Sequence, residues 1–378
     1  MDDGKTIKKK LLIAMSVFIV IVIGSLILLF FVSKKQSSLE GADSSVRLSA
    51  QSGFSCEFAE AQKLYPFRDG VLKVTTDRVA YLTSSGNEAY SVNVNYANPF
   101  CIFGGDYALV GDLDGYAFSV YDADGQIYSK STSDKVKGAA LSNDCYAAVI
   151  LDSEDAYGQV ILCEPDGTLF SNKWLSQDSG YPVSLCFNSD TTVLAITTVN
   201  TNGAILKPYI KLLNIKEDQG KMVAADYAIF SSEKDDMLST ILYCGDRFLV
   251  FGSDSAYVVT GEAISALNVQ YGSINYCYNV EDNLFLIYSD GVGQVNKIAV
   301  IDSGNNIVYD SVLGSVVNAF NTYKDKCVIS VDRRIFVIDS DGNVISDISV
   351  DEDVLKVGFI GNDKVIVVST GGVHTYTY

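Results

Sequence analysis

The eight cysteines are the residues of this chain with the widest potential chemistry. Neighbouring cysteines are 18 to 58 residues apart and no CxxC pair occurs, whereas thiolate metal sites and redox motifs use closely spaced cysteines. Most of them lie in apolar runs such as SLCFN and VILCE, where Cys packs as a small hydrophobic residue. The spacing therefore predicts free, buried thiols at Cys56, Cys101, Cys145, Cys163, Cys186, Cys244, Cys277 and Cys327.

Acidic turns are the second group with potential chemistry. They are DLDG (Asp112, Asp114), DADG (Asp122, Asp124) and DSDG (Asp339, Asp341). A calcium loop of the EF-hand type needs Gly at its sixth position and Glu at its twelfth, and none of these segments has both. Because Asp and Gly also suit tight turns between strands, we interpret these segments as turns and expect no metal site.

The presence of a single His, His374, argues against a His-based metal cluster, a Ser-His-Asp triad and a Cys-His pair. The 46 acidic residues single out no pair that would act as acid and base. No residue is therefore assigned a catalytic, cofactor-binding or metal-ligating role. The Tyr-rich stretches YGSINYCYN and HTYTY could form a binding face, although packing in strands is the commoner use.

The elements expected to position these residues are short apolar runs of four to seven residues, with a turn signal every eight to twelve residues. The 23 Tyr and 18 Phe among 378 residues favour strands, and a chain of this length forms one domain most readily when it is built from repeats. We therefore expect an all-β repeat protein.

Two families of turns recur along the chain, and the number of turns in each family indicates the number of repeats. One has Gly between two strands, at Gly86, Gly125, Gly167, Gly220, Gly261, Gly304 and Gly342. The other has Asp after a short apolar strand, at Asp69, Asp106, Asp144, Asp190, Asp246, Asp282, Asp325 and Asp363. A spacing of about 40 to 50 residues suits the four strands of one propeller blade.

The eight Asp turns predict an eight-bladed β-propeller over residues 54–378, with seven blades as the alternative. The last repeat has only three strands of its own, VLKVGFIG, KVIVVST and GVHTYTY. A propeller avoids an open sheet edge by completing its last blade with a strand from the other terminus. We expect that strand around Phe54 to Phe58, within SGFSCEF.

A membrane anchor is predicted at residues 11–32, because this run of 22 residues carries no charge and is long enough to cross a bilayer as a helix. The run is too long for the apolar region of a cleavable signal peptide. Four Lys precede it and two follow it, which favours a cytoplasmic tail at 1–10 and an extracellular propeller. Residues 33–53, rich in small polar residues, are expected to be a flexible linker.

Charge also limits the partners. Residues 1–36 hold six Lys against two Asp, whereas the remainder holds 22 basic and 44 acidic residues. A domain this acidic is repelled by phosphate backbones, so we expect no nucleic acid partner.

The period, the D-G turns and the terminal closure resemble the quinoprotein-like and WD40-like β-propeller superfamily. With the N-terminal anchor, the chain resembles membrane-anchored propeller proteins of uncharacterised function from clostridia and related Gram-positive bacteria. It departs from the enzymes of that superfamily, since Trp174 is its only Trp and it has no adjacent Cys pair. The Gly-His and Trp-Asp signatures of WD40 repeats are also missing.

These features predict a non-catalytic binding or scaffolding module of the cell envelope, without a cofactor, whose partner is a protein or a cell-wall component. The alternative is a quinone-dependent or carboxylate-based enzyme, which paired carboxylates in a central pocket would favour.

Overall fold

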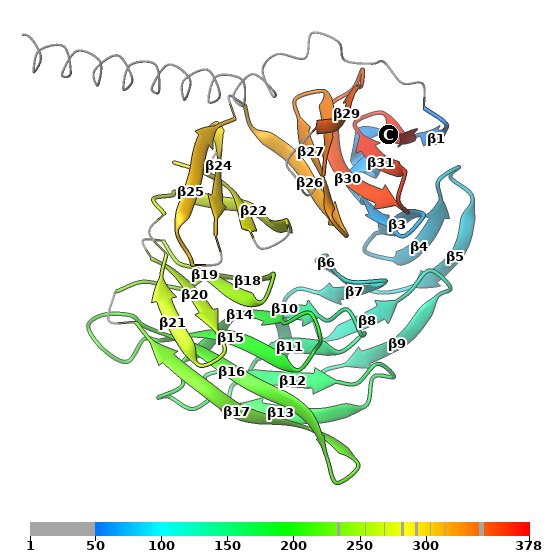
Figure 1. Ribbon diagram of the computed structural model, residues 1–378. Coiled ribbons are helices and arrows are strands. Elements are labelled where there is room, and N and C mark those ends of the chain that lie inside the picture. Colours follow the sequence, from blue (N-terminus) through cyan, green and yellow to red (C-terminus); the bar gives the residue numbers. More distant parts are fainter. Residues whose placement is uncertain are drawn as a thin grey trace, which may run out of the picture. The chain divides into compact units, whose positions relative to one another are not determined.

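The computed structural model describes residues 50–378, except 233, 234, 254, 268, 281, 282, 292, 293, 303, 314 and 340–343. These residues form eight four-stranded sheets, which follow one another around a ring as the blades of a propeller (Figure 1). The predicted eight-bladed β-propeller is confirmed, and the seven-bladed alternative is wrong.

Each blade is an antiparallel sheet whose four strands are taken in order from the centre outward. The first strands are β2 (Leu64–Phe67), β6 (Pro99–Gly104), β10 (Lys135–Leu141), β14 (Tyr181–Phe187), β18 (Thr240–Cys244), β22 (Ser273–Val280), β26 (Val317–Tyr323) and β30 (Val354–Ile360). The second strands are β3 (Gly70–Val74), β7 (Tyr107–Asp112), β11 (Ala147–Asp152), β15 (Val193–Asn200), β19 (Arg247–Phe251), β23 (Asn283–Ser289), β27 (Lys326–Val331) and β31 (Lys364–Ser369). The third strands are β4 (Arg78–Thr83), β8 (Ala117–Tyr121), β12 (Gln159–Cys163), β16 (Lys207–Asp218), β20 (Ala256–Thr260), β24 (Asn296–Ile301), β28 (Arg334–Ile338) and β32 (Gly372–Thr377). The outer strands are β5 (Glu88–Asn93), β9 (Gln126–Ser131), β13 (Leu169–Trp174), β17 (Lys221–Ser231), β21 (Ala263–Ala266), β25 (Ile307–Val312), β29 (Val344–Ser349) and β1 (Ser52–Ser55).

The two turn families predicted from the sequence occupy fixed places in the blades. The Asp turns join first to second strands, and the Gly turns join third to outer strands. Asp282 and Gly342 lie outside the described residues. Because strands within a blade alternate in direction, both turn families lie at the same end of their sheet.

Apolar packing between neighbouring blades forms the core. In the described residues, eight clusters of buried side chains each join two adjacent blades, including the last blade and the first. The middle strands are buried on both faces, as the fully buried β12 shows, whereas the outer β5 is mostly exposed. Continuous apolar runs such as QVILC therefore mark strands that lie between two blades.

Strand β1 closes the ring, as the sequence predicted. It pairs antiparallel with β32, placing Phe54 opposite Val373, and Ser52 Oγ lies 2.6 Å from Thr375 Oγ1. The strand covers only the first part of the expected segment and begins inside the expected linker. Phe58 instead starts the short helix α2 (Phe58–Ala61), which buries Ala61 between the first and last blades.

The predicted tail at 1–10, the membrane span at 11–32 and most of the linker lie outside the described residues. Within the part of the chain that the structure describes, no helix is both long and apolar enough to cross a membrane.

Candidate functional site

The cysteines occupy the strand positions that their apolar context predicted. Six lie in strands, whereas Cys56 follows β1 and Cys145 lies in the turn between β10 and β11. All eight are free thiols, and Cys145, Cys163, Cys244 and Cys327 are buried. Burial raises the pKa of the Cys163 thiol to about 11, which keeps it protonated and unreactive at neutral pH.

The acidic segments DLDG and DADG, which the structure describes in full, serve as turns between strands. Asp122 accepts hydrogen bonds from the backbone N–H groups of Asp124 and Gly125, each at 2.9 Å. Asp112 accepts one from Asn98, and Asp114 pairs with Lys137. Asp341 of DSDG lies outside the described residues. Among those residues, no three His, Cys, Asp or Glu side chains gather as metal ligands would.

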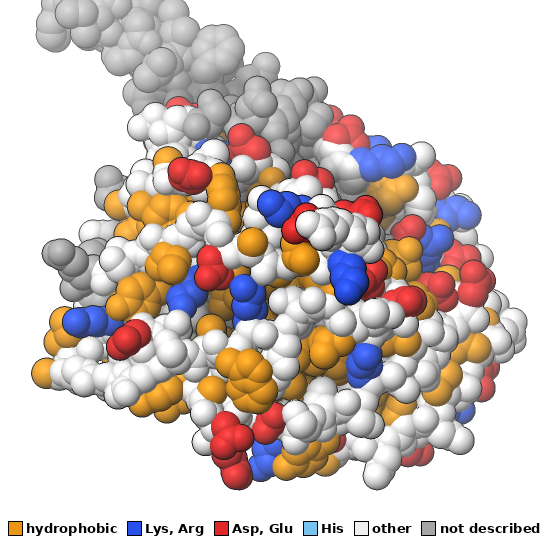
Figure 2. Space-filling view, turned by 90° about the horizontal axis from the view of Figure 1, so that it is seen from below, with side chains coloured by type: hydrophobic (Ala, Val, Ile, Leu, Met, Phe, Trp, Pro, Cys, Tyr) orange, Lys and Arg blue, Asp and Glu red, His pale blue; other side chains and the backbone are white. Residues whose placement is uncertain are grey.

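The outer surface shows no single dominant patch in the view of Figure 2. Hydrophobic side chains form several groups separated by acidic and basic ones. Exposed apolar residues scattered in this way are normal for a soluble domain. The interior of the ring is more informative.

A cavity of about 830 Å³ lies among the first strands of five blades, β2, β6, β22, β26 and β30. Its volume is in the range of pockets that hold small molecules. It follows directly from the fold, because side chains that point inward from a ring of eight first strands do not fill the centre completely.

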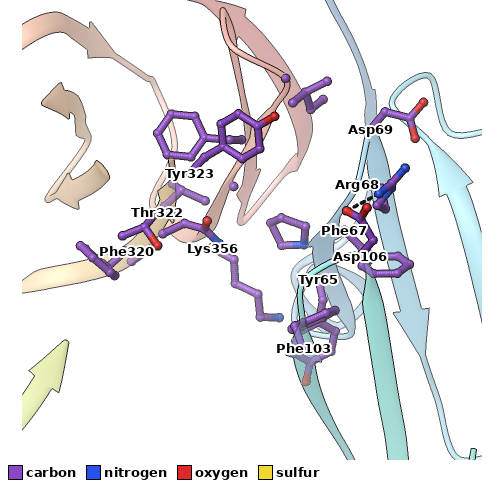
Figure 3. A pocket seen from close by; sticks show the side chains of 18 of the residues that line it. Tyr65, Phe67, Arg68, Asp69, Phe103, Asp106, Phe320, Thr322, Tyr323 and Lys356 are labelled. Carbon is purple, nitrogen blue, oxygen red and sulfur yellow. Dashed lines mark ion pairs between the residues drawn. The ribbon is translucent and has the colours of Figure 1, made fainter. Parts of the chain in front are cut away.

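Aromatic side chains form two walls of this cavity (Figure 3). On one wall, Phe103 packs against Tyr65 and Phe67, with ring centroids 6.2 and 5.7 Å apart. On the other, Phe320 of β26 packs against Tyr276 of β22 at 5.0 Å. Such rings offer flat apolar surface with little conformational entropy to lose on binding.

Lys356 is a charged side chain of the cavity lining that bridges the last blade and the first. It extends from β30 toward Tyr65, as Figure 3 shows, and its Nζ lies 3.9 Å from the centroid of that ring. The ammonium donates hydrogen bonds of 2.7 Å to the carbonyl oxygens of Gln62 and Leu64. Burial lowers the pKa of the Lys356 ammonium to about 8.

The rim of the cavity lies where the first strands end. Arg68, just after β2, forms an ion pair with Asp106, just after β6, and so links the first two blades. This ion pair raises the pKa of the Arg68 guanidinium. The Tyr81 hydroxyl donates a hydrogen bond to Asp69. Each of the two carboxylates at the rim is therefore held by a neighbouring side chain.

Gly358 brings β30 close to β2 beside Lys356. A Cβ atom at this position would lie 2.6 Å from the Cβ of Pro66, closer than two carbon atoms can approach. The absence of a side chain thus sets the spacing of the first and last blades at the cavity.

As a candidate for binding, sequence reasoning singled out one residue of this site, Tyr276, as part of the Tyr-rich stretch YGSINYCYN, whereas it named Asp69 and Asp106 only as turn residues. It missed Lys356, Tyr65, Phe103 and Phe320. A signal for the aromatic residues was present, because Tyr65, Phe103 and Phe320 each lie three to five residues before an Asp turn. Residues at that distance lie in a first strand, so an aromatic residue there marks a side chain near the centre.

Comparisons with known proteins agree with this architecture. The model of a family of unknown function, DUF5711, matches residues 46–377, and the chain belongs to this family. No curated protein matches the chain.

Solved structures with the same fold share little sequence with this chain. BamB from Moraxella catarrhalis is 13% identical, with a TM-score of 0.53, over 88% of this chain and 100% of that one. Sqt1 from Chaetomium thermophilum is 12% identical, with a TM-score of 0.56, over the same shares. Apo AztD from Citrobacter koseri is 12% identical, with a TM-score of 0.53, over 82% of this chain and 89% of that one. At such low identity the likeness concerns the propeller fold alone.

Proposed function

We propose that this member of the DUF5711 family is a non-catalytic binding module of the cell envelope, which holds a protein partner over the rim of its central cavity. The observation that carries the proposal is the aromatic-lined cavity of about 830 Å³ within a closed ring. A ring completed by β1 presents its rim residues in a fixed arrangement, which lowers the entropy lost when a partner binds.

The two carboxylates of the cavity bear on the enzyme alternative. A carboxylate that acts as acid or base must be available to the substrate. Asp106 is occupied by Arg68, and Asp69 accepts a hydrogen bond from Tyr81. Both therefore serve contacts within and between blades, which supports binding over catalysis.

The rim offers the kinds of side chain that protein interfaces favour. Tyr323, the last residue of β26, is 36% exposed, and Lys324 beside it lies 5.2 Å from the centroid of its ring. Arg68 contributes a partly exposed guanidinium. Tyr and Arg are enriched at interfaces because they combine apolar contact with hydrogen bonding.

Location at the envelope rests on the predicted anchor at 11–32, which would place the propeller outside the cell on a short linker. Intact cells that carry the full chain would be treated with an amine-reactive crosslinker that cannot cross membranes. We expect one defined protein adduct, formed equally with a crosslinker that does enter cells. An adduct formed only with the entering reagent would contradict the location. A ladder of adducts with amine-bearing cell-wall polymers would instead identify a cell-wall partner.

A further inference from the structure

The ammonium of Lys356 has no counter-ion in the part of the chain that the structure describes. Its contacts are two backbone carbonyl oxygens and the face of the Tyr65 ring. An ammonium has three N–H donors, so these two hydrogen bonds leave one donor for a further acceptor. A half-buried charge without a partner of opposite sign is costly, which makes this position unusual in a protein interior.

The acidic residues of the cavity do not supply that partner. Asp69 and Asp106 lie just beyond the ends of β2 and β6, where Tyr81 and Arg68 hold them. Lys356 is the third residue of β30, and it reaches the carbonyl oxygens at and just before the start of β2. The cation and the carboxylates thus lie at opposite ends of the first strands.

We propose that the cavity binds a small aromatic carboxylate, whose carboxylate pairs with Lys356 and whose ring lies between the aromatic walls. The chemistry of both halves of the ligand follows from the lining. A carboxylate would accept a hydrogen bond from the remaining N–H of Lys356 and neutralise its charge. A planar ring would pack against Tyr65 and Phe103 on one wall and Phe320 on the other.

This inference goes beyond the proposed function, because a small ligand inside the cavity requires no protein partner. The partner is proposed at the rim, near Arg68 and Tyr323, whereas the ligand contacts Lys356 and Tyr65. Either proposal can therefore fail while the other holds.

The pH dependence of binding follows from the groups that face Lys356. Burial lowers the pKa of Lys356 to about 8, whereas burial raises the pKa of Tyr65 on β2, of Cys101 on β6 and of Tyr276 on β22. Tyr323 of β26, and Arg68, Asp69 and Asp106, face the cavity from its rim. Lys356 is thus the group expected to lose its charge between pH 7 and 9.5, and carboxylate binding should weaken over the same range.

The test is titration calorimetry of the full chain in detergent at pH 7, with 3-phenylpropionate and its neutral amide as probes. We expect the carboxylate to bind at least tenfold more tightly than the amide. At pH 9.5 the affinity for the carboxylate should fall about fivefold, since a bound anion raises the pKa of Lys356 but does not keep it fully charged. Binding of the amide should not change.

Two variants complete the test. Lys356→Met should lower the affinity for the carboxylate at least tenfold, whereas Lys211→Met should not change it. Lys211 is the matched control, because burial also lowers the pKa of its ammonium, but it lies on the third strand β16 and does not line the cavity. If Lys356→Met unfolds, the pH series on the unchanged chain still decides. Equal affinity for the two probes, affinity that is constant with pH, or no binding of the carboxylate would overturn the proposal.

Discussion

At the scale of single residues, two kinds of buried side chain can be distinguished: those that pack between blades and those that face the centre of the ring. Cys163, Leu162 and Ile161 are buried between blades, where an apolar residue of similar volume would serve the same packing role. Lys356 lies on a first strand and combines a charge with burial, which packing alone does not explain. A residue of this kind is the best indication of a binding site in a fold whose blades are otherwise alike.

The cysteines provide a prediction at this scale. Mass analysis of the unfolded, unreduced protein after alkylation should find all eight thiols modified, because the folded protein has free thiols. In the folded protein, the four buried cysteines should react much more slowly than Cys56, since they are shielded from the reagent. A mass that corresponds to four disulfides would contradict this account.

Cys277 is the thiol whose neighbours make it a sensitive probe. Its hydrogen bond with Cys244 is the main cause of a pKa well above the ordinary value, and burial is the second cause. The two lie on β22 and β18, the first strands of consecutive blades. Slow alkylation of Cys277 would therefore report that these two blades are packed as described.

At the scale of strands and turns, most of the fold could be predicted from local sequence. Asp and Gly turns have local chemical causes, and a run such as QVILC reveals a strand buried on both faces without knowledge of its neighbours. The exact closing strand was harder to predict, because Ser52 and Thr375 are brought together by the whole ring. Lys356 could not be predicted for the same reason, since Gln62 and Leu64 are nearly 300 residues away in sequence.

Strand β1 provides the prediction for this scale. A chain that begins at Gln51 should unfold at the same temperature as one that begins at residue 37. A chain that begins at Cys56 should lose about 3 kcal/mol or more of stability, because about four backbone hydrogen bonds worth about 1 kcal/mol each disappear. Thermal unfolding and light scattering would measure this, and the shorter chain should also associate through its open edge.

Removing α2 in addition to β1 separates the contributions of these two elements to stability. A chain that begins at Ala61 loses most of this helix and its packing against the first and last blades. We expect a further decrease in the unfolding temperature. Equal stability of the chains that begin at Gln51 and Cys56 would show that β1 does not stabilise the ring.

At the scale of the whole molecule, the proposed function combines the propeller with the membrane anchor that the sequence predicts. The propeller part is described by the structure, whereas the anchor at 11–32 stays a prediction from the sequence. Full-length protein should remain with membranes in high salt and in carbonate, because the apolar run is long enough to cross the bilayer. A chain that begins at Ala50 should be soluble. Carbonate that releases intact full-length protein would disprove the anchor.

The central claim, that the rim of the cavity is where a protein partner binds, is tested most directly by photocrosslinking in living cells. A photoreactive phenylalanine analogue would replace Tyr323 at the rim or, as the control, Trp174 on the outer strand β13, which is 52% exposed. Both positions are exposed, so reagent access does not favour either one. We predict one defined protein adduct from position 323 and none from position 174. The same adduct from both positions, or an adduct from position 174 alone, would contradict the account.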